Sequence, residues 1–321
     1  MRIIPNAILL IFSLLIVPMV SFYFGVRLDP NAIQALKTLL VIAGLAIGLC
    51  FAAGELTGNV SQTDKLWSLM PIVYTWTVTC LGSFSPRLVL MSLLVTAWGL
   101  RLTYNFAMKG GYHWKIWQGK EDYRWQVLRE KPEFQSRWRW TAFNLFFIAG
   151  YQHLLVLLIT LPIVIALNFN MVPLGMLDYV AAIALLIFII YEAIADKQQW
   201  EFQVKKHAAS QGDMELHPEL AKGFLDRGLW AWSRHPNYFA EQSIWICFYL
   251  FSVTASGQWI NWSILGSLLL ILLFRGSSTF SEEITASKYP GYAEYQHRVA
   301  RFLPLPLCWP STSTRNRTED R

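Results

Sequence analysis

Residues 141–167 read TAFNLFFIAGYQHLLVLLITLPIVIAL and contain no Lys, Arg, Asp or Glu. The hydrocarbon core of a bilayer is about 30 Å thick, and a helix needs roughly 20 apolar residues to cross it. This stretch is long enough to do so. It is also far too poor in charge for a soluble domain, in which about a quarter of the residues are charged. We therefore predict a transmembrane helix here and an all-α integral membrane protein.

Seven further stretches of the chain share this apolar character. The whole chain is 54% hydrophobic and 15% charged, with a mean hydropathy of +0.34. The stretch nearest the N-terminus exceeds the roughly 7–15 apolar residues of a signal peptide, so we interpret it as a retained helix. We predict a polytopic helix bundle with about eight transmembrane helices, at residues 3–25, 36–53, 66–81, 88–106, 141–167, 175–195, 239–255 and 260–275.

Lys and Arg are concentrated in three of the segments that join or follow these helices. They are frequent in residues 107–140, 196–238 and 276–321 and absent from residues 168–174 and 256–259. The positive-inside rule then predicts that the basic segments and both termini are cytoplasmic, in a bacterial inner membrane or an endoplasmic reticulum. Because orientation explains the net charge of +6, we expect the lipid bilayer as a partner and no nucleic acid.

No residue pattern predicts a metal site or a soluble nucleotide-binding domain. The histidines show no ligand spacing, and no CxxC pair occurs among the four cysteines, Cys50, Cys80, Cys247 and Cys308. The GxGxxG, Walker A and GxSxG patterns are also absent. We therefore expect no metal cofactor and neither a Rossmann nor a P-loop fold.

Small residues recur every four positions in the second predicted helix, at Gly44, Gly48 and Ala52. This spacing places them on one face of a helix. In lipid, small faces allow two helices to approach closely. We expect this face to pack against a neighbouring helix.

The densest polar block of the sequence is GLWAWSRHPNYFAE, at residues 228–241. Pro236 suits the first turn of a helix, where its missing N–H would have no partner in any case. A carboxylate this close to hydrocarbon is costly unless it is paired, and a helix N-terminus beside an arginine attracts anions. The alternative is an interfacial belt of Arg and Trp. We favour a ligand site that contains Arg234, His235, Asn237, Tyr238 and Glu241.

Three further blocks place polar side chains near the cytoplasmic ends of predicted helices. Arg101, Tyr104 and Asn105 share one helix face, and Gly110-Gly111 is expected to end that helix. The tryptophans that follow are typical of a segment in the membrane interface. The other two blocks are the i, i+4 carboxylates of Glu192 and Asp196, and the run from Glu282-Glu283 to Tyr292 and Tyr295. For each block, simple emergence into water or an interfacial helix is the structural alternative.

Three of the motifs together resemble the DUF1295 family, which is grouped with steroid 5α-reductase and sterol-reductase membrane proteins. They are WSRHPNYFAE at residues 232–241, RLTYNF at 101–106 followed by EDYRW at 121–125, and NVSQTDKLWS at 59–68. The resemblance covers residues 59–304. It divides the chain into N-terminal transmembrane helices (1–58), a reductase-like membrane domain (59–304) and a C-terminal tail (305–321) that we expect to be disordered.

The resemblance implies an NADPH-dependent reductase that saturates a carbon–carbon double bond conjugated to a carbonyl in a lipophilic substrate. In such a site Arg would hold phosphates, and Asn, Asp and Glu would bind the ribose and the nicotinamide. The motif positions carried over are Arg234, Asn237, Tyr238, Glu241 and Asp196, with His235 and Tyr292 as additional candidates. Arg234 is also the candidate for the NADPH 2′-phosphate.

In the related steroid reductases a Glu and a Tyr on successive helices hold the substrate ketone. Glu55 and Tyr74 are the nearest counterparts in this sequence, although their surroundings differ from the family pattern. Asp64 is an equal contender for the catalytic acid.

Two other functions fit parts of the sequence. Membrane methyltransferases of isoprenylcysteine or phospholipids also carry an Arg-His-Pro turn followed by Glu-Glu and a later Tyr-x-x-Tyr, and there these residues would hold S-adenosylmethionine. A non-catalytic lipid-binding protein is the third possibility. Asn237 after the proline and the Arg101–Trp125 region favour the reductase. The oligomeric state is left open by the sequence.

Overall fold

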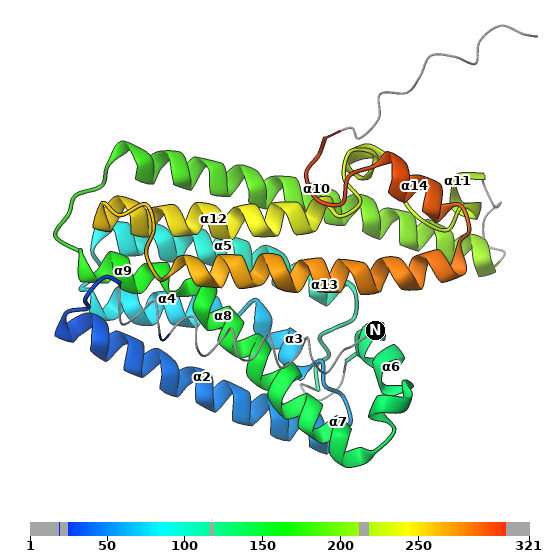
Figure 1. The fold of residues 1–321 in the computed structure, drawn as a ribbon, viewed down its shortest axis with the longest axis horizontal. Helices are drawn as coiled ribbons and strands as arrows, with labels where there is room; N and C mark the ends of the chain where they lie inside the picture. The colour runs from blue at the N-terminus through cyan, green and yellow to red at the C-terminus, as the bar shows by residue number, and fades with distance from the viewer. Residues whose placement is uncertain (1–18, 20–24, 116–118, 212–217, 306–321) are drawn as a thin grey trace, which may run out of the picture. The chain divides into compact units, whose positions relative to one another are not determined.

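A computed structural model describes residue 19 and residues 25–115, 119–211 and 218–305. The predicted helix at 3–25 and the predicted tail at 305–321 fall almost entirely outside this part of the chain. Within it the protein is all-α, as predicted (Figure 1). The described residues contain no β-strand, and a single isolated parallel bridge joins Ser233 and Ala300.

The longest helices in the described residues are those that the apolar stretches predict, and shorter helices lie in the connections. All helices of the described residues follow in chain order. They are α2 (Pro30–Thr57), α3 (Gln62–Trp67), α4 (Met70–Leu81), α5 (Pro86–Met108), α6 (Tyr123–Arg129), η1 (Pro132–Phe134), α7 (Arg137–Phe143), η2 (Asn144–Tyr151), α8 (Gln152–Thr160), α9 (Pro162–Asn168), α10 (Met176–Gln211), α11 (Pro218–Ala221), η3 (Gly228–Ala231), α12 (Pro236–Ser256), α13 (Ile264–Lys288) and α14 (Tyr292–Arg298).

Five helical stretches in the described part of the chain are long and apolar enough to cross a membrane. They are Pro30–Thr57, Pro86–Met108, Arg137–Asn168, Met176–Gln211 and Ile264–Lys288. Each contains or overlaps one predicted helix, so the chain is a multi-pass membrane protein. Three predicted helices are not among the five, and one of them, at residues 3–25, lies almost entirely outside the described residues. The other two are within the described part of the chain. One contains α4, whose 12 residues reach only about 18 Å at 1.5 Å per residue, and the other lies in α12.

The described residues divide into two compact units. The first unit contains the chain up to Ile190 together with Glu241–Arg275, and the second contains Tyr191–Ala240 and the chain from Gly276 onward. The helices α10, α12 and α13 each contribute residues to both units.

The stretch Arg137–Asn168 is the central helical segment of the first unit, with 83% of its apolar window buried. It is not one regular helix. Its middle part, η2, is a π-helix of 8 residues, and Pro162 starts α9 after a break at Leu161. Proline lacks the N–H that a continuous α-helix would use, which explains the break. π-helical segments are rare and occur frequently at functional sites.

The ends of several helices follow sequence signals. Asp29 caps α2, accepting a hydrogen bond from the Ala32 N–H at 2.7 Å. Gly110, at φ 81°, follows the end of α5 as predicted. At the opposite end of α5, Arg87 is buried and pairs with Asp178 at 2.9 Å. Arg87 also donates to the Val172 and Pro173 carbonyls, so it anchors the loop before α10.

The expected packing of the small-residue face of α2 is wrong for the described residues. A Cβ atom added at Gly44 or Gly48 would meet no described atom within 4 Å. The face of α2 that packs against α4, α8 and α9 is a different one, formed by Ala32, Ala35, Leu39, Ala43, Ala46 and Cys50. Its alanines are small as well, so close packing is achieved without the glycines.

Candidate functional site

The Arg-His-Pro-Asn turn lies in the second unit and is fixed by the chain that follows α14. The Arg234 N–H donates to the Ala300 carbonyl at 2.9 Å, and the His235 N–H donates to the Arg301 carbonyl at 3.0 Å. Pro236 is the first residue of α12, as the sequence predicts. Backbone hydrogen bonds therefore hold the turn independently of its side chains.

The side chains of this turn converge on one buried carboxylate, Glu282 of α13, which is 2% exposed. Arg234 Nε and His235 Nε2 both lie 2.8 Å from its Oε1 atom. Gln296 Nε2 lies 2.9 Å from Oε2, and Arg301 Nη2 lies 3.5 Å from it. These five residues form what we call the Glu282 cluster.

Most hydrogen-bond donors of the Arg234 guanidinium are occupied inside this cluster. Besides Glu282, its Nη1 atom donates to the carbonyls of Gln296 and Val299. A phosphate at Arg234 would therefore have to replace hydrogen bonds that hold the turn together. Arg301 is more accessible, because 32% of its side chain is exposed.

The imidazole of His235 is buried between the carboxylate and an aromatic ring. Burial, which disfavours the charged form, lowers its pKa below the ordinary value of 6.5, although the hydrogen bond with Glu282 acts in the opposite direction. Tyr238 stacks on it with ring centroids 5.2 Å apart. Of the predicted site residues, His235 and Tyr238 are thus brought together with Arg234.

Asn237 and Asp196 form a separate pair in the second unit. The Asn237 Nδ2 atom donates to Asp196 Oδ1 at 3.3 Å, whereas Asn237 Oδ1 is buried and has no hydrogen-bond partner in the described part of the chain. A buried acceptor without a partner costs about 1–3 kcal/mol. The carboxamide is therefore held in place by Asp196 with its acceptor available to a ligand.

Tyr292 contributes to packing in the second unit. Its ring makes an edge contact with Phe224 at a centroid distance of 5.1 Å, and burial raises the pKa of its hydroxyl. Tyr295, one turn further along α14, donates to the Trp230 carbonyl. The two tyrosines thus connect α14 to the segments that precede the turn.

Glu241 belongs to the first unit, where it is buried at 4% exposure. It accepts hydrogen bonds from the indole N–H groups of Trp98 at 2.8 Å and Trp245 at 2.9 Å. Arg101 Nη2 lies 3.8 Å from its Oε2 atom. Tyr104, expected on the same helix face as Arg101, is instead 67% exposed.

The motif at residues 59–68 is a hub of the first unit, and its main partner is the motif at residues 121–125. The Val60 N–H donates to Glu121 Oε1 at 2.9 Å, and the Asp122 N–H donates to Ser61 Oγ at 3.0 Å. Trp125 Nε1 donates to Asp64 Oδ2 at 3.0 Å. Both motifs carry the resemblance to one family, but no pattern in the sequence predicts that they touch.

Asp64 is the carboxyl of this hub whose acidity is weakened. Burial raises its pKa above the ordinary value of 3.8, and the nearby Asp122 charge adds to the effect. Hydrogen bonds from Ser61 and Trp125 partly offset it. A carboxyl with a raised pKa can act as a general acid.

The structure does not pair Glu55 with Tyr74. Glu55 is exposed at the end of α2, where it accepts hydrogen bonds from Thr141 at 2.9 Å and Asn144 at 2.8 Å. Tyr74 is completely buried, and its hydroxyl has no hydrogen-bond partner in the described residues.

Tyr74 lies where α2, α4 and α8 pack against one another. On the neighbouring helix α2, the sulfur of Cys50 lies 3.7 Å from His153 Nε2. The Cys50 thiol also approaches the Gln62 carbonyl at 3.6 Å. A small polar region therefore lies inside an otherwise apolar core, and neither Cys50 nor His153 was predicted as a site residue.

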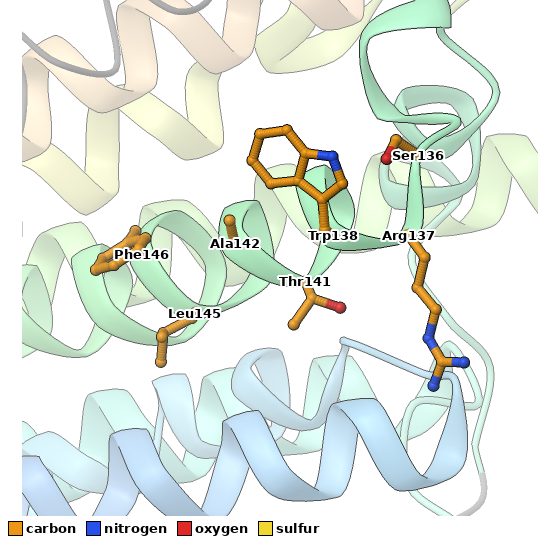
Figure 2. Close-up of a pocket in the computed structure, with 7 residues that line it drawn as sticks. All are labelled: Ser136, Arg137, Trp138, Thr141, Ala142, Leu145 and Phe146. Carbon is orange, nitrogen blue, oxygen red and sulfur yellow. The ribbon is translucent and has the colours of Figure 1, made fainter.

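A hollow of 660 Å³ on the surface of the first unit does not contain the predicted site residues. Its lining comes from α7 and η2 (Figure 2): Ser136, Arg137, Trp138, Thr141, Ala142, Leu145 and Phe146. Arg137 is the only charged residue of this lining, and Trp138 and Phe146 are largely exposed. This composition is typical of a surface in contact with lipid.

Sequence reasoning missed Arg301, Gln296 and Trp98 as members of these sites. Arg301 carries a detectable signal, because it lies six residues beyond Tyr295 in a segment already singled out. Trp98 carries none, since a tryptophan in an apolar helix is indistinguishable from ordinary core.

Comparison with known proteins identifies relatives but no activity. The DUF1295 family model, described as a protein of unknown function, matches residues 50–299. An uncharacterized protein of Schizosaccharomyces pombe is 37% identical over 260 residues, which cover 77% of this chain and 73% of the relative. No solved structure matches the chain.

Proposed function

The chain belongs to the DUF1295 family, and from that premise we propose that it is a membrane-embedded, NADPH-dependent reductase. Its substrate is a lipid that carries a carbon–carbon double bond conjugated to a carbonyl. The resemblance of its motifs to those of the steroid and sterol reductases supports the reaction class, and the second unit supplies the residues for the cofactor.

The observation that carries the proposal is the Asn237–Asp196 pair. A nicotinamide carboxamide and a ribose hydroxyl both need a partner that can donate and accept. Asn237 has a buried Oδ1 atom without a partner, and Asp196 fixes its orientation at 3.3 Å. An apolar side chain in place of Asn237 would leave these polar groups of the cofactor without a hydrogen-bond partner. The Asn237–Asp196 pair is therefore suited to recognise the cofactor.

Bound NADPH would supply a hydride to the β-carbon of the enone, and Asn237 and Asp196 would hold its nicotinamide half. The electron pair of the double bond moves toward the carbonyl oxygen, and a proton from the protein or solvent completes the α-carbon. NADPH and a proton are consumed, and NADP⁺ and the saturated ketone are formed. A hydrogen-bond donor at the carbonyl oxygen lowers the barrier by stabilising the developing enolate.

Tyr74 is our candidate for that donor, because its buried hydroxyl has no partner in the described residues. Glu55 suits the role less well, since it is exposed and accepts two hydrogen bonds. Asp64 is the second candidate, because burial raises its pKa. Glu241 and Arg101 of the first unit, with Tyr104 and Asn105, were expected to bind cofactor, and that expectation stays a prediction.

We also propose eight transmembrane helices with both termini and all motif-bearing loops in the cytoplasm. The sorting of Lys and Arg between loops supports this orientation, and the five candidate spans are compatible with it. Labelling of single cysteines by a membrane-impermeant maleimide from either side of sealed vesicles tests it. Labelling of residue 120 and of residue 170 from the same side would contradict it.

Calorimetry on the protein in mild detergent tests the cofactor. We expect NADPH to bind, and S-adenosylmethionine not to bind. The reverse result would replace the reductase with the methyltransferase, and binding of neither would leave a non-catalytic lipid-binding protein. Oxidation of NADPH in the presence of a long-chain enone, followed at 340 nm, is the matching activity assay.

Asn237→Leu tests the residue that carries the proposal. Removing one hydrogen-bonding group from a buried polar contact costs about 1–3 kcal/mol, so we expect NADPH affinity to fall by about tenfold or more. Asn170→Leu is the control, because Asn170 is an exposed asparagine of the first unit. Unchanged NADPH binding in Asn237→Leu would remove the support that this pair gives.

A further inference from the structure

A cavity of 320 Å³ in the second unit is lined in part by Phe224 and Tyr295. Glu294, Tyr295 and Arg298 of α14 line it, together with Gly291, the residue that precedes this helix. Gln296 and Val299 of the same segment bond Arg234 instead. The segment from Gly291 to Val299 therefore contributes both to this cavity and to the Glu282 cluster. The remaining lining residues are Ala221, Lys222, Phe224, Asp226, Tyr289 and Pro290.

The aromatic side of this cavity is closely fitted. Phe224 contacts the rings of Tyr289 and Tyr295, with centroid distances of 6.5 and 5.4 Å. Gly223 has a φ of +82°, and a Cβ atom there would lie 2.0 Å from the Tyr289 ring, so only glycine fits. The backbone of this loop thus presses against an aromatic wall.

The opposite character is supplied by four charged lining residues, the cations Lys222 and Arg298 and the carboxylates Asp226 and Glu294. Asp226 is only 13% exposed, and its Oδ2 atom lies 2.7 Å from Lys222 Nζ and 3.7 Å from Arg298 Nη2. About half of each cation's side chain is exposed. Lys222 and Arg298 can therefore reach an anion from solvent while Asp226 holds them side by side.

Size and chemistry together select the ligand. Ligand pockets usually measure about 300–1,000 Å³, so this cavity suits one nucleoside half of a dinucleotide and is too small for the whole. Aromatic rings stack on a purine base, the half-buried carboxylate of Asp226 can accept from amino or hydroxyl groups, and Lys and Arg side by side bind phosphate.

We propose that this cavity binds the adenosine 2′-phosphate half of NADPH, with the base against Phe224 and Tyr289 and the 2′-phosphate on Lys222 and Arg298. This inference rests on the proposed function and deepens it. It also moves preference for NADPH over NADH away from Arg234, whose donors are used by Glu282 and by two backbone carbonyls.

The test uses the two halves of the cofactor separately, by calorimetry on the full-length protein in detergent. The probes are adenosine 2′,5′-bisphosphate, 5′-AMP and reduced nicotinamide mononucleotide. Wild type is expected to bind the bisphosphate at least about tenfold more tightly than 5′-AMP, because the 2′-phosphate gains charge-assisted hydrogen bonds. Absence of measurable bisphosphate binding to wild type would overturn the inference.

The variants Lys222→Gln and Arg298→Gln isolate the phosphate contact. Each is expected to lose about tenfold in bisphosphate affinity, with little change for 5′-AMP and none for the reduced mononucleotide. Arg227→Gln is the matched control, because Arg227 is equally exposed, pairs with Glu219 and does not line the cavity. Wild-type binding in both cavity variants, or an equal loss in the control, would overturn the assignment.

Tyr289→Leu tests the stacking wall independently of charge. It is expected to weaken the bisphosphate and 5′-AMP by the same factor, about tenfold, with Tyr289→Phe restoring both. Thermal unfolding of each variant separates a binding loss from a folding loss. A stably folded Tyr289→Leu that binds both nucleotides like wild type would remove the base from this wall.

The two proposals fail in different ways. If the cavity variants act as expected but neither reduced nicotinamide mononucleotide binds nor NADPH is oxidised, the nucleotide cavity stands and the reductase falls. If NADPH is bound and oxidised while the cavity variants behave as wild type, the reductase stands and this cavity is not its adenosine site.

Discussion

Around Glu282 in the second unit, each charged side chain of the cluster has a hydrogen-bonded partner. Around Tyr74 in the first unit, a fully buried hydroxyl has no partner in the described residues. Both regions are polar and buried, and both come from segments that the sequence singles out. A cluster whose hydrogen bonds are complete holds the fold together, whereas a buried group left incomplete is available for a ligand. Burial and polarity alone do not distinguish the two roles.

Replacing the carboxylate of the complete cluster should have the largest effect on stability. Glu282→Gln leaves Arg234 and His235 buried without their anion, and breaking such a pair costs about 3–5 kcal/mol. We expect a marked fall in the thermal unfolding temperature in detergent, or failure to fold. Glu283→Gln is the neighbouring control, because Glu283 is exposed. Equal unfolding temperatures for Glu282→Gln and wild type would show that the cluster does not stabilise the second unit.

Removing the Tyr74 hydroxyl should have the opposite effect, lowering activity without lowering stability. Tyr74→Phe deletes a hydroxyl that has no partner in the described residues, so the unfolding temperature should stay constant or rise. If Tyr74 donates to the carbonyl oxygen, kcat should fall by about 100-fold or more. Tyr151→Phe is the matched control, since Tyr151 is also buried and also has an unpartnered hydroxyl. A Tyr74→Phe enzyme with wild-type kcat would remove Tyr74 from the reaction.

Lowering the pH is expected to destabilise the Glu282 cluster through His235. Its pKa in the folded protein lies below the ordinary value of 6.5, so the unfolded chain binds the proton more readily. The contribution of His235 to stability is therefore complete above pH 6.5 and declines as the pH falls below it, by at most about 1.4 kcal/mol per pH unit until the folded pKa is reached. His235→Gln should flatten this part of the stability curve, as measured by chemical unfolding between pH 5 and 8. If His235→Gln keeps the same slope of unfolding free energy against pH, that slope comes from another titrating group.

The smallest effect is expected at Glu55, the exposed carboxylate that is one of the three predicted catalytic candidates. Thr141→Val removes one hydrogen bond to Glu55, which is worth about 0.5–1.5 kcal/mol when buried and less at the surface. We expect a change of a degree or two in unfolding temperature and no change in kcat. A large loss of kcat in Thr141→Val or Glu55→Gln would restore Glu55 to the catalytic group.

The sequence predicts the membrane helices well because apolar length is a property of the residues themselves. The stretch at 141–167 and the helix start at Pro236 are both found where they were expected. The interruption by η2 was not predicted, since a π-helix and an α-helix require the same apolar composition.

The candidate site is less predictable because it depends on partners distant in sequence. The turn at residues 234–237 was identified, but Arg234 was expected to hold a phosphate and is instead bonded to Glu282, 48 positions away. Asn237 and Asp196 are both predicted site residues, and a hydrogen bond joins them across 41 positions. The contact of Cys50 with His153 spans 103 positions, and no local pattern announces it.

The π-helix η2 has a consequence for comparing this chain with its relatives. A π-helix holds more residues per turn than an α-helix, so a relative with an α-helix of the same axial length here would have one residue fewer. The gap in a correct alignment would then fall inside a membrane helix, where gaps are ordinarily penalised most. An alignment that moved this gap into a loop would displace Gln152 and His153 by one position and assign the polar region beside Cys50 to the wrong residues.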